Sequence, residues 1–400
     1  MRTRREILLG VGALATSNNL AAMVEAGLPA GAVATAEMLR LPGKLPLIKR
    51  SYRPPNLETP REYFRDVLTP NRAFFVRYHH ANIPAVDARK WALQITGPAA
   101  NAPAGFTLAQ LRHEFEQVEI TALCLCSGNR RGLFQPHVMG VQWGSGAMGN
   151  ARWRGVRLRD VLQRAGVRAD ALEVAFEGAD GPVLPGTPDF QKSLPIDKAL
   201  DPETLIAFDM NGESLPHWHG APARLVVPGW TATYWLKHLT SIELRNSAFD
   251  NFWVKTGYRV PLGRFPGQSR FATQESVSNT PITDIIVNSL ITTAAPRGAI
   301  AAARPLDVRG MAWDSGAGIR AVETSTDRGV SWQAAVLGKD SGRFSLRPWS
   351  AHMDLSQLKG AVTILARATS NNGTTQPLQA IANPSGYHHN AIQTLEVVVA

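Results

Sequence analysis

The chain has 400 residues, of which 44% are hydrophobic and only 18% are charged. This length allows two packed domains, and the 34 glycines and 27 prolines indicate a loop-rich, strand-containing chain rather than a helical bundle. The net charge of +10 is spread without Lys/Arg blocks, which argues against a nucleic-acid-binding protein, and two neighbouring cysteines do not support a disulfide framework.

The first 36 residues have the pattern of an export signal. Arg4 and Arg5 precede an apolar run from Ile7 to Ala15, the layout of a twin-arginine signal peptide. Because this route exports folded proteins, the pattern predicts a periplasmic protein that folds before it leaves the cytoplasm. An ordinary N-terminal helix is the alternative. The apolar runs fall short of the roughly 20 residues that a membrane-spanning helix needs.

Residues 37–62 are rich in proline and predict an extended arm. The run Phe74–His80 that follows alternates like a β-strand, which places Arg77 and His79 on one face. A guanidinium stays charged at any relevant pH, and its planar fork can hold an oxyanion. The strand therefore offers a group that binds an anion, with an exposed arginine on an edge strand as the alternative.

A second predicted strand leads directly into a turn. Residues 118–124 alternate β-forming side chains, so Cys124 and Cys126 are expected on one face. The run Ser127-Gly-Asn129 predicts a turn whose backbone N–H groups approach a ligand, and Arg130 and Arg131 follow it. A thiolate beside such a turn and two guanidiniums suits a metal held by an anionic cofactor. A buried strand cysteine with two surface arginines is the alternative.

The motif Cys126-Ser-Gly-Asn-Arg-Arg131 resembles the metal-binding motif of the sulfite oxidase family of molybdopterin enzymes. The resemblance extends with gaps from about Tyr63 to the C-terminus, and within the family it is strongest to the bacterial periplasmic sulfite dehydrogenases. It implies Mo-molybdopterin as the cofactor, with Cys126 as the metal ligand. It also implies an α+β fold, with a molybdopterin-binding catalytic domain over residues 37–265 and an immunoglobulin-like β-sandwich for dimerisation over residues 283–400.

The segment after the cysteine motif predicts a helix and an acidic turn. Leu158, Val161 and Leu162 recur at helical spacing and are expected on the buried face of an amphipathic helix. Glu177-Gly-Ala-Asp-Gly181 is a turn pattern. The resemblance implies that Asp180 contacts the pterin, where a carboxylate accepts ring N–H bonds. Capping of its own turn is an equal alternative for this residue.

A second dense region spans His217–Lys237. Leu225–Val227 predicts a buried strand that ends at Pro228-Gly229. Three groups around it can donate to a phosphate, and the resemblance identifies them with the family's pterin-phosphate site: His219, Arg224 and Lys237. His217 and His219 could also form a zinc pair, although no third ligand is evident nearby.

From residue 262 onward the pattern changes. Residues 262–282 are rich in Gly, Pro and Ser and predict an interdomain linker. Short alternating runs then recur with turn signals between them, as is typical of a β-sandwich. The runs are Ile285–Leu290, Leu306–Trp313, Ile319–Ser325 and Val362–Ala368.

The resemblance also implies roles for individual residues. Arg77 would face the substrate oxyanion, with His79 as a hydrogen-bonding partner, and Tyr258 would hydrogen-bond the equatorial oxygen ligand of molybdenum. The family brings an arginine from the second domain toward the sulfate position, and Arg347 is the candidate, with a surface arginine as the alternative. The implied cofactor contacts are Phe75, Val76, Arg77, Tyr78, His79, Asp180, His219, Arg224, Trp235, Leu236 and Lys237.

The function that the resemblance implies is two-electron oxidation of sulfite to sulfate. The sequence lacks haem-attachment, dinucleotide and flavin motifs, so a separate c-type cytochrome is expected to accept the electrons, with the chain forming a homodimer or a complex with a cytochrome subunit. The alternatives are another oxo-transfer enzyme of the same fold, reducing nitrate or a sulfoxide, a non-catalytic binding module, and a basic nucleic-acid-binding protein.

Overall fold

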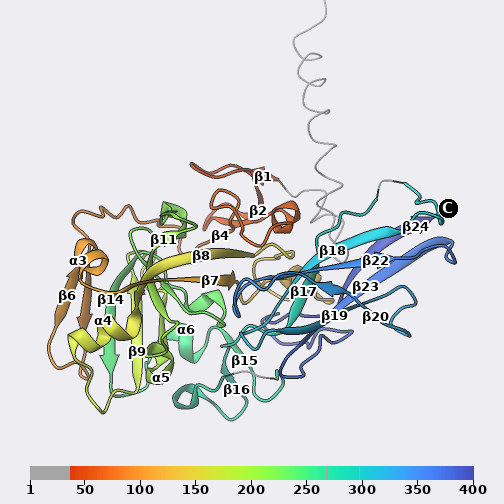
Figure 1. The fold of residues 1–400 in the computed structure, drawn as a ribbon. Coiled ribbons are helices and arrows are strands. Elements are labelled where there is room, and N and C mark those ends of the chain that lie inside the picture. Colours follow the sequence, from red (N-terminus) through yellow and green to blue (C-terminus); the bar gives the residue numbers. More distant parts are fainter. Residues whose placement is uncertain (1–36, 267–268, 297) are drawn as a thin grey trace, which may run out of the picture.

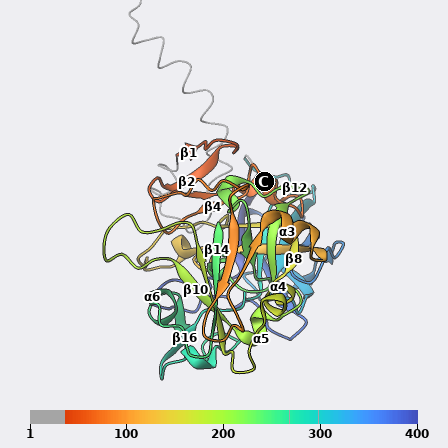
Figure 2. The same ribbon diagram turned by 90° about the vertical axis from the view of Figure 1, so that its left-hand side faces the viewer.

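The structure, a computed structural model, describes residues 37–266, 269–296 and 298–400. The predicted export signal over residues 1–36 lies outside the described residues. Figure 1 shows the first lobe in warm colours and green, and a second lobe of blue strands that ends at the C-terminus. Figure 2 shows the first lobe turned toward the viewer.

A small antiparallel sheet opens the described chain, with its strands in the order β1-β2-β3-β4. The strands are β1 (Met38–Leu39), β2 (Leu47–Ser51), β3 (Asn56–Glu58) and β4 (Val76–Arg77). The predicted extended arm therefore pairs with itself rather than running free. Leu47 and Leu57 are fully buried and pack with Val76 on one side of this sheet, which explains why the segment folds back.

Two larger sheets form the body of the first lobe. One has the order β10-β9-β14-β5-β6, and all its pairs are antiparallel except β14 with β5. Its strands are β5 (Ala92–Thr96), β6 (Ala104–Thr107), β9 (Glu173–Gly178), β10 (Gln191–Pro195) and β14 (Leu239–Arg245). The other has the order β12-β11-β8-β7, with β13 also paired to β11. Its strands are β7 (Gln117–Leu125), β8 (Met148–Arg157), β11 (Leu205–Met210), β12 (Glu213–Ser214) and β13 (Arg224–Val226).

The helices of the described residues are short and lie between strands. The α-helices are α3 (Leu108–His113), α4 (Leu158–Ala165), α5 (Ile196–Ala199) and α6 (Phe252–Lys255), and the 3₁₀ turns are η1 (Arg61–Phe64), η2 (Arg131–Leu133), η3 (His217–His219), η4 (Ala232–Tyr234) and η5 (Ala272–Gln274). In α4 the buried residues include Leu158, Val161 and Leu162, which confirms the predicted amphipathic face. Across the described ranges, no helix has the length and hydropathy of a membrane span.

The predicted linker over residues 262–282 packs against the first lobe. An antiparallel strand pair encloses it: β15 (Arg259–Pro261) lies directly before it and β16 (Asn279–Pro281) lies near its end. Phe271 is 1% exposed and packs in a cluster with Phe249. The amide of Gln274 donates to the Glu173 carboxylate at 3.0 Å. A segment rich in Gly, Pro and Ser is therefore held in place by buried aromatic residues and buried polar contacts, which its composition did not indicate.

Two four-stranded sheets make up the second lobe, with the orders β17-β18-β22-β21 and β20-β19-β23-β24. The first holds β17 (Asn288–Ile291), β18 (Leu306–Trp313), β21 (Val336–Leu337) and β22 (Arg347–Met353); the second holds β19 (Ile319–Ser325), β20 (Gln333–Ala334), β23 (Gly360–Ser370) and β24 (Gln393–Val399). The predicted runs Leu306–Trp313 and Ile319–Ser325 match β18 and β19. A shared core between the sheets confirms the predicted β-sandwich.

The two lobes share a buried boundary. Leu123 of β7 donates its backbone N–H to the Phe344 carbonyl at 2.9 Å. Leu123 and Leu125 pack in one apolar cluster with Trp313 and Leu346 of the second lobe. The strand that leads into the cysteine motif, β7, therefore contacts the sandwich through its last residues.

Candidate functional site

The strand β7 ends at Leu125, and a tight turn follows directly. We call residues Cys126–Arg131 the cysteine turn. The Cys126 N–H donates to the Ala147 carbonyl at 2.9 Å, and the Asn129 side chain accepts from the Ala147 N–H at 3.0 Å. Arg130 has φ = +66°, a left-handed conformation that closes the turn. Cys126 is 9% exposed and lines a cavity. The turn thus holds the thiol rigidly at the cavity wall.

The two arginines of the cysteine turn contact the second lobe rather than the cavity. Arg130 donates to the Asn288 side chain at 2.8 Å and to the Ser289 carbonyl at 2.7 Å. Arg131 donates to the Ser385 carbonyl at 2.8 Å. The sequence pattern predicts that these guanidiniums support an anion. Backbone and amide oxygens of the second lobe satisfy them instead, so they fasten the turn to the sandwich.

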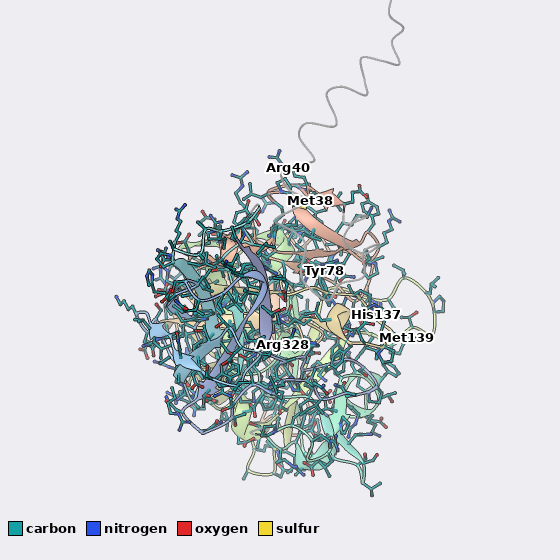
Figure 3. The ribbon with its side chains drawn as sticks, turned by 90° about the vertical axis from the view of Figure 1, so that its right-hand side faces the viewer. Met38, Arg40, Tyr78, His137, Met139 and Arg328 are labelled. Atoms are coloured by element: carbon teal, nitrogen blue, oxygen red, sulfur yellow. The ribbon has the colours of Figure 1, made fainter. Side chains whose placement is uncertain are left out.

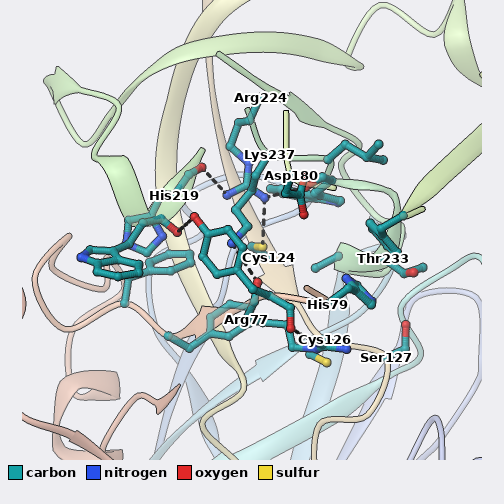
Figure 4. Close-up of a pocket in the computed structure, with 18 of the residues that line it drawn as sticks. Arg77, His79, Cys124, Cys126, Ser127, Asp180, His219, Arg224, Thr233 and Lys237 are labelled. Atoms are coloured by element: carbon teal, nitrogen blue, oxygen red, sulfur yellow. Dashed lines mark hydrogen bonds between the residues drawn. The ribbon is translucent and has the colours of Figure 1, made fainter. Parts of the chain in front are cut away.

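The cavity is partly open to solvent, and polar and apolar side chains line it together. Figure 4 shows Cys126 on one side of it and Arg224 and Lys237 on the other, with Cys124 between them. In Figure 3 Tyr78, which lines the cavity, lies inside the molecule, while Met139 lies on a projecting loop. Tyr78 is 1% exposed and Met139 is 92% exposed.

Three polar side chains meet close to Cys126. The Tyr258 hydroxyl shares a hydrogen bond with Nε2 of His79 and lies 3.5 Å from Nη2 of Arg77. His79 stacks on Phe190 with ring centroids 3.4 Å apart. Burial, followed by the charge of Arg77, lowers the pKa of His79 well below its usual value, so its imidazole is neutral at pH 7. Burial raises the pKa of Tyr258, which therefore keeps its proton.

The opposite side of the cavity gathers buried cations. Arg224 is 4% exposed and donates to the carbonyls of His219 at 3.1 Å and Trp235 at 2.9 Å. Its Nε has no hydrogen-bond partner among the described residues. Lys237 donates to the Arg77 carbonyl at 2.8 Å. Buried cations that rely on carbonyl partners favour an anionic ligand beside them.

A lysine from the N-terminal sheet extends this cationic side. Lys44 is 2% exposed, and its Nζ donates to the Asn71 carbonyl at 2.7 Å and lies 2.8 Å from Nε2 of His219. Burial lowers the pKa of Lys44 to about 7. The carboxylate that lines the cavity is Asp180, whose pKa is raised, chiefly by burial. Basic side chains therefore outnumber acidic ones around this ligand space.

One glycine is required where the loop after η3 passes Lys237. Gly220 has φ = +102°, and a Cβ placed there would lie 2.7 Å from the Lys237 Cβ. A larger residue would push the lysine out of position and would strain the backbone. The pattern His219-Gly220 is therefore needed to place both the imidazole and the ammonium.

Most of the residues proposed from the sequence line this cavity. They are Phe75, Arg77, Tyr78, His79, Cys126, Asp180, His219, Arg224, Trp235, Leu236, Lys237 and Tyr258. Val76 does not line it, because strand alternation turns this side chain into the core, where it is 0% exposed. Tyr78 joins Arg77 and His79 because β4 ends at Arg77 and the alternation stops there.

Arg347 is not brought into the cavity. It opens β22, and its guanidinium forms an ion pair with Asp340 at 2.8 Å. The expectation that this arginine reaches the substrate position is therefore corrected, because Arg347 forms an ion pair with a neighbouring acid of the sandwich. The destination of a long guanidinium depends on such tertiary partners, which the local sequence does not reveal.

Several cavity residues were missed by the sequence analysis. The hydroxyls of Ser127 and Thr233 line the cavity and have no partner among the described residues. Phe190 and Trp218 supply aromatic walls. Ser127 could have been found, since it lies inside the cysteine motif. The others belong to segments with no chemical signature of their own.

Comparison with known proteins gives matches over both lobes. Residues 80–253 match a family model described as the oxidoreductase molybdopterin binding domain, and residues 279–399 match the Mo-co oxidoreductase dimerisation domain. The chain is 32% identical to mitochondrial sulfite oxidase of Drosophila melanogaster, covering 87% of this chain and 62% of the relative. It is 32% identical to mitochondrial sulfite oxidase of Homo sapiens, covering 90% of this chain and 67% of the relative.

Two further similarities concern other reactions. The chain is 31% identical to the NADH nitrate reductase of Spinacia oleracea, covering 88% of this chain and 39% of the relative. The sulfane dehydrogenase SoxCD from Paracoccus pantotrophus has a similar structure, with a TM-score of 0.73 and 26% identity over 94% of this chain and 93% of that chain. The matches to the two sulfite oxidases of the preceding paragraph cover 62% and 67% of the length of those proteins.

Proposed function

Because the chain belongs to the sulfite oxidase family of molybdopterin-dependent oxidoreductases, we propose that it oxidises sulfite to sulfate. The observation that carries the proposal is the convergence of the Cys126 thiol with Arg77, His79 and Tyr258 in one cavity. In this reaction sulfite and water give sulfate, two protons and two electrons. The protein must therefore bind an oxyanion, release two protons and transfer two electrons to an acceptor.

The cavity fits the cofactor of the family, Mo-molybdopterin. A thiol lies on one side and buried cations lie on the other, with aromatic walls between them. The Arg224 Nε and the hydroxyls of Ser127 and Thr233 lack partners, so polar atoms are available to a ligand. Cys126 would hold the metal, while His219, Arg224 and Lys237 would hold the phosphate. When bound, the molybdenum centre supplies the two-electron oxidation chemistry.

The residues beside Cys126 have distinct tasks in this proposal. Arg77 binds the sulfite oxyanion, because its charge is permanent and its fork is planar. Tyr258 keeps its proton and offers a hydroxyl that can donate or accept. His79 is neutral, so its Nε2 can accept a hydrogen bond from that hydroxyl and orient it. Asp180 would accept ring N–H bonds of the pterin.

The electrons leave to a separate acceptor in this proposal, and a c-type cytochrome in the periplasm is the expected partner. The twin-arginine pattern at Arg4 and Arg5 supports export. The match of the second lobe to a dimerisation domain supports a homodimer, which light scattering of the purified protein tests directly.

The direct experiment combines elemental analysis of purified protein with a sulfite-dependent cytochrome c reduction assay. We expect one molybdenum per chain and reduction that requires sulfite. The same preparation should be offered nitrate with a reduced dye, because the nitrate reductase similarity makes nitrate the competing substrate. Metal-loaded protein that reduces nitrate and ignores sulfite contradicts the proposal, as does protein without molybdenum.

A further inference from the structure

Tyr258 has an unusual backbone for a large residue. Its φ is +59°, in the left-handed region that aromatic residues rarely occupy. Such a conformation persists only where surrounding contacts hold it, and it concentrates at functional positions. The contacts that hold Tyr258 therefore decide where its hydroxyl lies.

One ring lies parallel to that of Tyr258. Tyr387, from the segment between β23 and β24 of the second lobe, stacks on it with centroids 5.5 Å apart and planes 11° apart. The other aromatic neighbours of Tyr258 among the described residues are inclined to it. Phe190 meets it at 71° and Trp253 at 46°. The flat face of Tyr258 therefore rests on a residue of the sandwich.

Tyr387 is itself fixed in place. Its N–H donates to the Asn383 side chain at 2.9 Å, and the same side chain donates to the Tyr387 carbonyl at 2.8 Å. The Arg131 guanidinium lies 5.2 Å from the centroid of the Tyr387 ring. Tyr387 is 8% exposed and is not among the residues that line the cavity. One ring thus contacts the cysteine turn through Arg131 and the candidate active-site tyrosine through stacking.

We propose that Tyr387 is a positioning residue, whose ring sets the orientation of Tyr258 toward Arg77 and His79. The inference rests on the proposed function, in which Tyr258 contacts the reacting groups. Parallel stacking restricts tilt of the Tyr258 ring while leaving its hydroxyl edge free for the cavity. The second lobe would then contribute to the reaction by packing, in addition to any role in assembly.

The first test uses molybdenum-loaded enzyme and three variants. Tyr387→Phe keeps the ring and should keep kcat within about twofold, whereas Tyr387→Leu should lower kcat about 10- to 100-fold, because misplacing a reacting group by ~1 Å costs this much. KM for sulfite should change less than kcat, because Arg77 is untouched. Phe344→Leu is the matched control. Phe344 is a buried ring at the same lobe boundary, without a ring contact to Tyr258, and its loss should lower Tm without lowering kcat.

The second test does not depend on activity. The chain has six tyrosines, so uniform 3-fluorotyrosine labelling gives a simple fluorine NMR spectrum, and Tyr258→Phe identifies the Tyr258 resonance. We expect Tyr387→Leu to shift or broaden that resonance and Phe344→Leu to leave it in place. If Tyr387→Leu does not fold, Tyr387→Met, which keeps the volume of a long side chain, takes its place with the same measurements.

The outcomes separate this inference from the proposed function. Protein that does not oxidise sulfite but shows the expected shift of the Tyr258 resonance supports the positioning contact and contradicts the function. An unchanged resonance together with unchanged kcat in Tyr387→Leu overturns the positioning role. Equal losses of kcat in Tyr387→Phe and Tyr387→Leu also overturn it, because the hydroxyl and not the ring would then matter.

Discussion

At the scale of single residues, the thiol of Cys124 in β7 and the thiol of Cys126 just after this strand have different surroundings. Cys124 is 2% exposed, lies 4.0 Å from Nη2 of Arg224, and has its pKa raised by burial to about 11. It therefore stays a thiol at neutral pH. Cys126 begins the cysteine turn, whose Asn129 side chain fixes the neighbouring backbone. The turn, and not the strand, is the part of this segment built to present a ligand.

Replacing Cys126 by Ser should abolish activity and the thiolate-to-molybdenum absorption, since serine does not supply a soft sulfur ligand. Cys124→Ser should keep most of the turnover. Optical spectra and molybdenum content of both variants check this. The reverse pattern would assign the metal to Cys124.

Arg77→Gln should lower kcat/KM for sulfite, because a neutral amide replaces a charged donor. A hydrogen bond to a charged group contributes about 1.5–3 kcal/mol, which corresponds to roughly 10- to 150-fold. Arg347→Gln is the matched control, since Arg347 pairs with Asp340 outside the cavity. Steady-state kinetics at equal metal content measures kcat/KM of both variants. A larger loss in the Arg347 variant would reverse the assignment.

Lys192 on β10 gives a pH-dependent prediction. It is 0% exposed, donates to the Trp253 carbonyl at 2.6 Å, and lies 4.7 Å from the centre of the Tyr234 ring. Burial lowers the pKa of Lys192 from 10.5 to about 7. Between these pH values the unfolded chain binds a proton that the folded chain lacks. The contribution of Lys192 to the free energy of unfolding therefore rises with pH between these values. Below about pH 7 the buried ammonium destabilises the folded protein to its full extent.

Lys192→Met removes that cost. The variant should gain stability over the parent at pH 7, and the gain should shrink by about 2 kcal/mol at pH 9. Urea unfolding at both pH values measures the difference, with the same change at the half-exposed Lys255 as the control. A gain that is equal at both pH values would show that Lys192 is charged in the folded protein throughout this range.

At the scale of elements, long periodic runs of buried residues predicted helices and strands better than short runs did. The strands β18 and β19 and the helix α4 were predicted closely, because each buries one face over seven or more residues. The N-terminal sheet has strands of two to five residues, too short for a period to be recognised. The contiguous motifs around Arg77, Cys126 and Lys237 located most of the cavity. Val76, Arg347 and Lys44 depend on alternation or distant partners, so local motifs misplace or miss them.

The N-terminal sheet should matter for cofactor retention. Lys44, between β1 and β2, contacts His219 with its Nζ, 2.8 Å from the imidazole Nε2. Lys44→Met removes a buried amine beside the proposed phosphate-binding groups, so the purified variant should contain less molybdenum and pterin than the parent. Lys49→Met is the matched control, because Lys49 pairs with Glu37 on the same sheet at 2.5 Å. Equal cofactor content in both variants would place Lys44 outside the phosphate site.

At the scale of the whole molecule, the two lobes act as one unit around the cavity. Arg130 and Arg131 connect the cysteine turn to the sandwich, and Tyr387 stacks on Tyr258 across the same boundary. Sequence patterns indicated two domains but not these contacts between them, because each contact links residues more than a hundred positions apart. The site is complete only when both lobes are folded together.

We expect export of the whole protein to depend on its N-terminal arginine pair. Changing Arg4-Arg5 to Lys-Lys should leave cofactor-loaded precursor in the cytoplasm, because the twin-arginine route reads that pair and carries folded cargo. Cell fractionation with molybdenum analysis of each fraction checks this. Normal amounts of the Lys-Lys variant in the periplasm would exclude the route.

The cysteine turn is synthesised long before the segment that fastens it. The Arg131 guanidinium donates to the Ser385 carbonyl, and the Ser127 carbonyl accepts from the His388 N–H at 3.3 Å. Both partners lie more than 250 residues after the turn in the sequence. We therefore expect the cysteine turn to capture a cofactor only after the segment up to His388 has been synthesised and has folded against it. Ribosome-bound chains arrested before residue 383 should purify without molybdenum, and metal on such nascent chains would show that loading precedes completion.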